Sequence, residues 1–392
     1  MSSFLPYGRQ TIDERDIAAV TAALADPFLT QGPRVESFER ALADSVGAAH
    51  AVAFANGTAA LHACAHAAGL GPGDELLTTP ISFVASANCA LFMGASPLFA
   101  DVDAASANLD LPRALDAGLA TRAKACVAVS MAGLPVDLVP LQEARRAGLV
   151  VIEDACHALG AVRGGRPVGG DGLADMSVFS FHPVKAITSG EGGMVTTDDA
   201  SLADALRTFR THGIRRGTPG PAPLQGGWHY DIDSLGFNYR ITDFQCALGE
   251  HQLGRLGEFV ERRNEVAERY RELLEGVEGL RLPERAPDDG RHAYHLFVVR
   301  FEEGSERRRL AYDHLHAGEI GVQLHYIPIP VHGLYRSLGY SMEGLDEAQA
   351  YYEQALSLPI FPTMTDEDVV RVVERLREAL KLPLPEPAGT AP

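Results

Sequence analysis

Short runs of apolar and β-branched residues alternate with alanine-rich stretches between about residues 50 and 200. The alanine-rich stretches, among them 58–68 and 139–147, carry apolar positions at helical spacing. Runs that are apolar almost throughout are typical of strands covered on both faces of a sheet. The pattern therefore predicts an α/β fold with a doubly wound, mostly parallel sheet, whose ligands should gather at the carboxyl ends of the strands. The predicted strands are residues 51–55, 75–79, 97–100, 125–130, 149–153, 176–180 and 193–197.

The C-terminal part of the chain has a different pattern. Thr242 is a candidate N-cap for one long helix that runs toward Val277, with charges between its apolar positions. We expect a large domain, residues 1–255 with an N-terminal arm, and a small α+β domain, residues 256–392. The small domain is predicted to contain a strand at 294–300, a helix at 305–317, a strand at 321–325 and a final helix after Thr365. The Pro-rich segments 218–225 and 384–392 are predicted to be an exposed loop and a frayed end.

Charge and composition narrow the classes of partner. The chain has 392 residues and a net charge of −18, so binding to nucleic acid or to an anionic membrane would work against its own field. A phosphate-bearing ligand must therefore meet locally placed donors. No apolar stretch approaches the ~18 residues of a spanning helix, the start lacks an export signal, and the five cysteines lack CxxC spacing. We expect a cytoplasmic protein with reduced thiols and with neither nucleic acid nor membrane as partner.

Three features together indicate a cofactor site. Asp154 ends the apolar run LVVIED, where a carboxylate faces a ligand or merely caps a helix. Lys185 lies between two predicted buried strands, where desolvation favours a neutral amine unless the side chain reaches solvent. The segment 56–58, Asn-Gly-Thr, begins a helix whose free amides suit a phosphate, and Ser180 offers a second hydroxyl group. A carboxylate, a lysine and a phosphate cradle are what pyridoxal phosphate requires.

Other chemistries lack their sequence patterns. The chain has no GxGxxG after a strand, no GxxxxGK[ST] and no GxSxG, which disfavours dinucleotide, P-loop and serine acyl-enzyme sites. His62 and His66 share a helical face without an acid between them, which favours a core or surface pair over zinc, so no metal is expected. Phe83, in the loop after a predicted strand, either stacks on a cofactor ring or packs in the core.

The chain resembles the sugar-nucleotide aminotransferases of the DegT/StrS type, which have the type I fold of pyridoxal phosphate-dependent transferases. The resemblance covers nearly the whole chain. It rests on LTQG at 29–32, NGTAAL from Asn56, EDACHALG from Glu153, SFHPVKAITSGEGG from Ser180 and LGFNYRITDFQ from Leu235. It implies an enzyme, a transaminase, with pyridoxal 5'-phosphate as cofactor and pyridoxamine phosphate as its intermediate form.

The resemblance also implies a role for each matched residue. Lys185 would form the Schiff base, Asp154 would pair with the pyridine nitrogen, and His157 would orient that carboxylate or the ring hydroxyl group. Phosphate contacts are implied for Gly57, Thr58 and Ser180, and ring stacking for Phe83. Asn238 would reach the phosphate of the other subunit, which implies a homodimer with shared active sites. Substrate contacts are implied for Tyr7, Thr30, His325, Tyr326 and Arg240, although His325 and Tyr326 could serve packing alone and Asn238 and Arg240 could be turn and surface residues.

A finer resemblance concerns the substrate. The segments TTPISFVASAN, LHYIPIP and YYEQALSLPIFP are similar to those of family members in pseudaminic acid synthesis. These act on a UDP-linked 4-keto-6-deoxy-N-acetyl hexose, aminating C4 with L-glutamate as donor. The alternatives are an aminotransferase for another nucleotide-linked keto sugar, dTDP-linked and aminated at C3 or C4, and a catalytically silent cofactor-binding regulatory protein. Intact Asp154, His157 and Lys185 argue against the silent protein, and Lys185 argues against related dehydratases, which carry histidine there.

Overall fold

The computed structural model describes residues 4–216 and 228–384. The predicted loop at 218–225 and, apart from Leu384, the predicted frayed end lie outside these residues.

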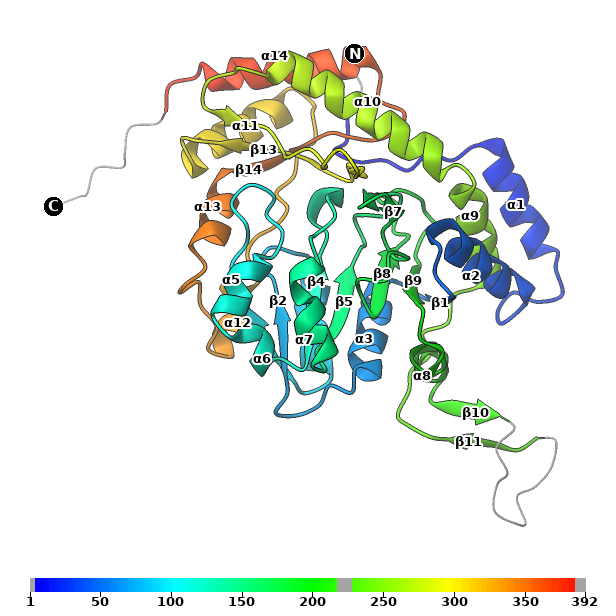
Figure 1. Cartoon of the computed structure of the whole chain (residues 1–392). Helices are drawn as coiled ribbons and strands as arrows, with labels where there is room; N and C mark the ends of the chain where they lie inside the picture. The colour runs from blue at the N-terminus through cyan, green and yellow to red at the C-terminus, as the bar shows by residue number, and fades with distance from the viewer. Residues whose placement is uncertain (1–3, 217–227, 385–392) are drawn as a thin grey trace.

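A seven-stranded sheet forms the centre of the molecule, in the order β1-β9-β8-β5-β4-β2-β3 (Figure 1). All neighbouring strands are parallel except β9, which runs antiparallel to both β1 and β8. The strands are β1 His50–Phe54, β2 Glu75–Thr78, β3 Ser96–Phe99, β4 Ala125–Val129, β5 Val150–Asp154, β8 Met176–Ser180 and β9 Gly193–Thr197. Each predicted strand is thus confirmed to within about one residue, as is the mostly parallel sheet.

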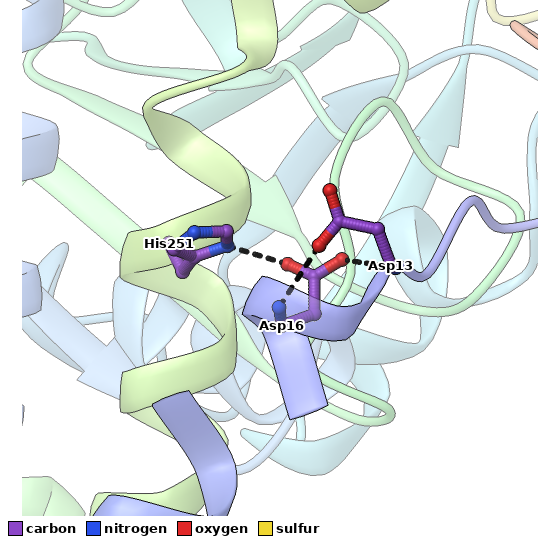
Figure 2. A group of neighbouring side chains, drawn as sticks. All are labelled: Asp13, Asp16 and His251. Atoms are coloured by element: carbon purple, nitrogen blue, oxygen red, sulfur yellow. Dashed lines mark hydrogen bonds and ion pairs between the residues drawn. The ribbon is translucent and has the colours of Figure 1, made fainter. Parts of the chain in front are cut away.

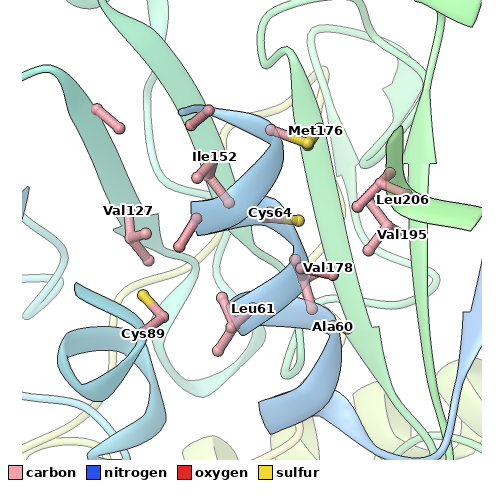
Figure 3. Packing of buried hydrophobic residues seen from close by; sticks show 14 of the residues in the cluster. Ala60, Leu61, Cys64, Cys89, Val127, Ile152, Met176, Val178, Val195 and Leu206 are labelled. Carbon is pink, nitrogen blue, oxygen red and sulfur yellow. The ribbon is translucent and has the colours of Figure 1, made fainter. Parts of the chain in front are cut away.

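Helices cover both faces of this sheet. On one face, Cys64 of α3 lies among Ile152, Met176 and Val178, and Leu206 of α8 lies beside Val195 (Figure 3). A second cluster of buried residues on the other face joins α2 and α9 to β1 and β8. The helices of this region are α1 Glu14–Leu24, α2 Pro33–Val46, α3 Gly57–Ala67, α4 Ala85–Phe92, α5 Leu111–Asp116, α6 Leu119–Arg122, α7 Gln142–Arg146 and α8 Ala200–Arg210.

Two short antiparallel pairs complete this part of the chain. The pair of β6, Val162–Arg163, and β7, Arg166–Pro167, follows β5. The pair of β10, Ile214–Arg216, and β11, Tyr230–Ile232, forms a ribbon that extends away from the sheet beyond α8 (Figure 1).

The predicted long helix after Thr242 is two helices, α9 Asp243–Leu253 and α10 Leu256–Leu274. Thr242 does begin α9, and its amide donates to Gln245 Oε1 at 3.2 Å. The prediction of one continuous helix was wrong because the chain turns at Gly254, a weak helix former. The Arg255 amide donates to the Gln252 carbonyl in this tighter turn, at 3.0 Å.

Above the sheet, α10 packs with a second, three-stranded sheet and the last helices (Figure 1). These elements are β12 Leu280–Arg281, β13 Phe297–Phe301, β14 Ala355–Leu358, α11 Ser305–Ala317, α12 Gly333–Ser337, α13 Asp346–Gln354 and α14 Asp366–Leu380. The helices at 305–317 and after Thr365 are confirmed. The strand at 321–325 was wrong, since only Gln323 pairs there, with Ser357 of β14. The apolar run that becomes β14 occupies the edge of β13 instead.

The N-terminal arm crosses between the two layers. Leu5 pairs with Ile320 and is buried in the hydrophobic cluster of the upper layer, and the Tyr7 carbonyl accepts from the Ile360 amide at 3.1 Å. The arm therefore packs with the C-terminal elements, while the domain boundary at residue 255 stays a prediction. None of the helices in the two described ranges is long and apolar enough to cross a membrane.

A group of polar side chains fastens α1 to α9 (Figure 2). The fully buried Asp16 accepts from His251 Nδ1 at 2.6 Å and from Gln252 Nε2 at 2.8 Å. Arg255 Nη1 pairs with Asp13 at 2.9 Å. Asp13, Asp16 and His251 lie close enough to share a cation. Because Arg255 already supplies the positive charge, we interpret the group as the anchor of α1.

Candidate active site

A cavity of about 780 Å³ lies at the carboxyl ends of the central strands and the start of α3. It brings together most of the residues that the sequence singled out, from segments far apart in the chain. Those that line it are Tyr7, Gly57, Thr58, Phe83, Asp154, His157, Ser180, Lys185, His325 and Tyr326.

Asp154 is a buried carboxylate at the end of β5 with two hydrogen-bond donors. Its Oδ2 accepts from Ser86 Oγ at 2.7 Å, and its Oδ1 accepts from the Cys156 amide at 3.2 Å. The carboxylate is thus held in one orientation at the edge of the cavity.

The neighbouring acid, Glu153, serves a different purpose. Successive side chains of a strand point to opposite faces of a sheet. Glu153 is fully buried and bonds to the Arg163 guanidinium at 2.9 Å and to Ser130 Oγ at 2.6 Å. Its charge is neutralised within the fold, so of these two neighbouring acids Asp154 is the one that lines the cavity.

Lys185 lies in the loop between β8 and β9. Burial lowers its pKa from the ordinary value of 10.5, although the nearby Cys156 and Asp154 act in the opposite direction. A lowered pKa increases the fraction of neutral amine at physiological pH. The residue therefore has the character of a nucleophilic amine.

The first turn of α3 forms an anion cradle. Asn56 Oδ1 accepts from the Ala59 amide at 2.8 Å, while helix geometry leaves the amides of Gly57 and Thr58 without an intrahelical acceptor. A Cβ atom on Gly57 would lie 3.2 Å from the Cβ atom of Ser180. The bare glycine therefore keeps open the space between the helix start and the Ser180 side chain.

The far wall of the cavity is made of histidines and tyrosines. Tyr326 Oη lies 3.2 Å from His157 Nε2, and the rings of His157 and His295 are 4.3 Å apart. Burial first, and the charge of Lys185 second, hold the pKa of His157 well below its ordinary value and lower that of His325 to about 3. These imidazoles are therefore neutral hydrogen-bonding groups at physiological pH.

The geometry revises one expected contact. His157 faces Tyr326 and His295, whereas the Asp154 carboxylate is oriented by Ser86 and the Cys156 amide. The contact of His157 with a ring hydroxyl group stays a prediction. Ser86 and His295 were not predicted from the sequence. The signal for Ser86 was a polar residue in the first turn of a mostly apolar helix, α4.

Three predicted site residues lie outside this cavity. Thr30 is exposed and pairs with Thr242, and Asn238 is exposed and pairs with Thr211. Arg240 lines a separate cavity of about 510 Å³ together with Arg207 and other residues. Within one chain the structure does not bring these three residues to Lys185, so their roles stay predictions.

The residues at the cavity fit pyridoxal phosphate. An oriented carboxylate, a lysine of lowered pKa and an open cradle of amides and a hydroxyl group surround the same space. Each of these groups matches one part of the cofactor: the ring nitrogen, the aldehyde and the phosphate.

Comparison with known proteins agrees with this geometry. Residues 10–377 match the DegT/DnrJ/EryC1/StrS aminotransferase family. The chain belongs to this family. The spore coat polysaccharide biosynthesis protein SpsC of Bacillus subtilis (strain 168) is 40% identical over 383 residues, which cover 96% of this chain and 97% of SpsC.

Solved structures of relatives also match the fold. Helicobacter pylori PseC, an aminotransferase involved in the biosynthesis of pseudoaminic acid, superimposes with a TM-score of 0.88 at 30% identity, covering 96% of this chain and 99% of PseC. Spr1654 of Streptococcus pneumoniae, in its PMP form, gives a TM-score of 0.88 at 27% identity, covering 96% and 98%. The predicted type I fold and the pyridoxal phosphate cofactor are confirmed, and this family member is a sugar aminotransferase.

Proposed function

We propose that this aminotransferase transfers the amino group of L-glutamate to C4 of a UDP-linked 4-keto-6-deoxy-N-acetyl hexose. The observation that carries the proposal is that His325, Tyr326 and Tyr7 line the same cavity as Lys185. Neutral imidazole and phenol groups offer hydrogen bonds to a sugar without adding charge. The likeness to PseC, whose description names the biosynthesis of pseudoaminic acid, supports the same substrate class.

In this proposal each residue of the cavity has one task. Bound pyridoxal phosphate supplies a protonated ring that takes up the electrons of the bond broken at the donor carbon. Asp154 holds the proton on the ring nitrogen. Lys185 Nζ would hold the cofactor at its aldehyde carbon and, in each half of the reaction, would move a proton between that carbon and the substrate carbon that bears the nitrogen. The amides of Gly57 and Thr58 and the Ser180 hydroxyl group bind the phosphate.

We further propose that the enzyme is a homodimer in which Asn238 completes the phosphate site of the partner. Asn238 is exposed and lies outside the cavity of its own chain. In the chain segment that leads to Asn238, Trp228 is 78% exposed and Leu235 is 82% exposed. Exposed apolar groups of this kind are typical of a surface that another chain covers.

A second candidate is amination of a different nucleotide-linked keto sugar, dTDP-linked and aminated at C3 or C4. The 40% identity to SpsC, a spore coat polysaccharide biosynthesis protein, favours keeping this candidate.

A substrate panel distinguishes the two candidates. The enzyme is incubated with L-glutamate and with UDP- and dTDP-linked 3-keto and 4-keto sugars, and the position of the new amine is determined by NMR. We expect turnover of the UDP-linked 4-keto sugar with the amine at C4. A preference for a dTDP-linked sugar, or an amine at C3, would support the second candidate and reject the first.

A further inference from the structure

Two serine hydroxyl groups lead to the Asp154 carboxylate, one from Ser82 in the loop before α4 and one from Ser86 on α4. Ser86 is fully buried, and its Oγ lies 2.7 Å from Asp154 Oδ2. Ser82 Oγ lies 2.8 Å from Ser86 Oγ on the other side. Ser82 lines the cavity, whereas Ser86 lies behind it.

The acceptors within reach of Ser86 decide which way these hydrogen bonds run. A serine hydroxyl group has one proton to donate. For Ser86 the alternatives are Asp154 Oδ2 at 2.7 Å and the Phe83 carbonyl at 3.3 Å. The carboxylate is both closer and charged, so the Ser86 proton belongs to Asp154. Ser86 Oγ is then free to accept from Ser82, which fixes the direction of the chain as Ser82 to Ser86 to Asp154.

We propose that Ser86 is a positioning residue for the reaction, whose hydroxyl group orients the Asp154 carboxylate so that Asp154 holds the proton on the ring nitrogen of the cofactor. The inference rests on the assignment of Asp154 in the proposed function. The other oxygen of Asp154 has a backbone donor, the Cys156 amide at 3.2 Å, which no side-chain substitution removes. Ser86 thus supplies the hydroxyl donor to this carboxylate, beside the weaker thiol donor of Cys156.

A matched control exists at Glu153, the residue before Asp154 in β5. Ser130 is fully buried, and its hydroxyl group donates to Glu153 Oε1 at 2.6 Å. Ser130→Ala therefore removes the same kind of bond, from a serine to a buried carboxylate of β5. It does so at the acid that Arg163 neutralises within the fold rather than at the cavity. Both alanine variants should lose thermal stability to a similar extent, and only one should affect the cofactor.

The test uses holoenzyme loaded with cofactor labelled with ¹⁵N in the ring, whose NMR shift reports protonation of that nitrogen across a pH series. The single-turnover rate of amino transfer from glutamate is measured in parallel. We expect Ser86→Ala to shift the titration of the ring nitrogen to lower pH and to slow the transfer roughly tenfold, because a hydrogen bond to a charged group is lost. Ser86→Thr, which keeps the hydroxyl group, should restore both, and Ser130→Ala should change neither.

Other outcomes would contradict either the role of Ser86 or the assignment of Asp154. A wild-type titration in Ser86→Ala, or an equal shift in Ser130→Ala, would overturn the role of Ser86. If Ser86→Ala does not fold, Ser86→Cys, with its weaker donor, must show a smaller shift in the same direction, and an unshifted titration rejects the inference. The Asp154→Asn variant tests the assignment of Asp154 separately from the role of Ser86. If it leaves the ring nitrogen protonated as in the wild type, the assignment of Asp154 is itself wrong.

Discussion

At the scale of single residues, the site depends on groups placed in environments that change their chemistry. Burial lowers the pKa of Lys185, and two donors hold Asp154 in its orientation. Gly57 keeps open the space beside Ser180, because it has no Cβ atom to fill it. These effects are local, so single substitutions test them directly.

Replacing Lys185 with alanine should abolish transamination and leave the fold intact. The amine both binds the aldehyde carbon and carries the proton, and loss of a general acid–base group alone costs roughly 10²- to 10⁴-fold in rate. The rate of amino transfer from glutamate and the circular dichroism spectrum check the two parts. An undiminished rate in this variant would show that Lys185 is not the reacting lysine.

Replacing Gly57 with alanine should weaken cofactor binding by roughly tenfold. The new methyl group would lie 3.2 Å from Ser180 Cβ and 3.4 Å from Cys156 Sγ, in the space assigned to the phosphate. A shortened or displaced phosphate contact loses a charge-assisted hydrogen bond, worth roughly 1.5 kcal/mol or more. The dissociation constant of the cofactor, measured by fluorescence, reports the effect. Gly257→Ala is the control, because a Cβ atom there meets no atom within 4 Å.

At the scale of elements, helix α3 links the phosphate cradle to a cluster of aromatic rings. His62 is buried on α3, and its Nδ1 lies 3.1 Å from Tyr239 Oη. The rings of Phe209 and Phe237 each lie 5.0 Å from the ring of His62. This packing agrees with the interpretation of His62 as a core residue rather than a zinc ligand. Tyr239 itself lines the active-site cavity and follows Asn238 in the chain.

Acid should destabilise the protein through His62. Burial, followed by the charge of His66, lowers the pKa of His62 from 6.5 to about 4. Between these values the unfolded chain binds a proton that the folded chain does not, so the free energy of unfolding falls as the pH is lowered through this window. The loss should be on the order of 1–2 kcal/mol. Urea unfolding at several pH values should show a shallower loss for His62→Gln, and an unchanged slope would contradict this origin.

At the scale of the whole molecule, the active site is assembled from both layers of the fold. Lys185, Asp154 and Gly57 come from the large sheet and its helices, whereas His325 and Tyr326 come from the C-terminal elements. Tyr7 arrives on the N-terminal arm, which packs with those C-terminal elements. With a net charge of −18, the chain would have to hold the proposed nucleotide sugar, an anion, through placed donors. We expect Asn238 and Arg240 of a second chain to add to these donors.

Mixed dimers should recover activity that neither parent has. In a dimer of one Lys185→Ala chain and one Asn238→Ala chain, one of the two sites contains both intact residues. We expect partial activity after mixing the two variants, measured as amino transfer, with subunit exchange followed independently by differently tagged chains. If the tags show exchange and activity does not return, the sites are not shared.

The sequence alone determined much of the large sheet and of its chemistry. The seven strands of the central sheet follow from local apolar runs. Helix starts such as Thr365 follow from local capping, where the Asp368 amide donates to Thr365 Oγ1 at 3.1 Å. Asp154, Lys185 and Gly57 were identifiable because each follows or precedes a strand in a pattern that the cofactor requires. These signals act over a few residues, so they can be read along the chain.

Only the tertiary structure decided which groups meet across long sequence distances. Ser86 and Asp154 are 68 positions apart and Tyr326 and His157 are 169 apart, and no local pattern couples such pairs. The break at Gly254 and the pairing of β14 in place of residues 321–325 likewise depend on what packs against each segment. Propensity differences between such alternatives are about 1 kcal/mol or less per residue, whereas burial of a large side chain contributes about 1.5–3 kcal/mol. Packing therefore overrides local preference wherever the two disagree.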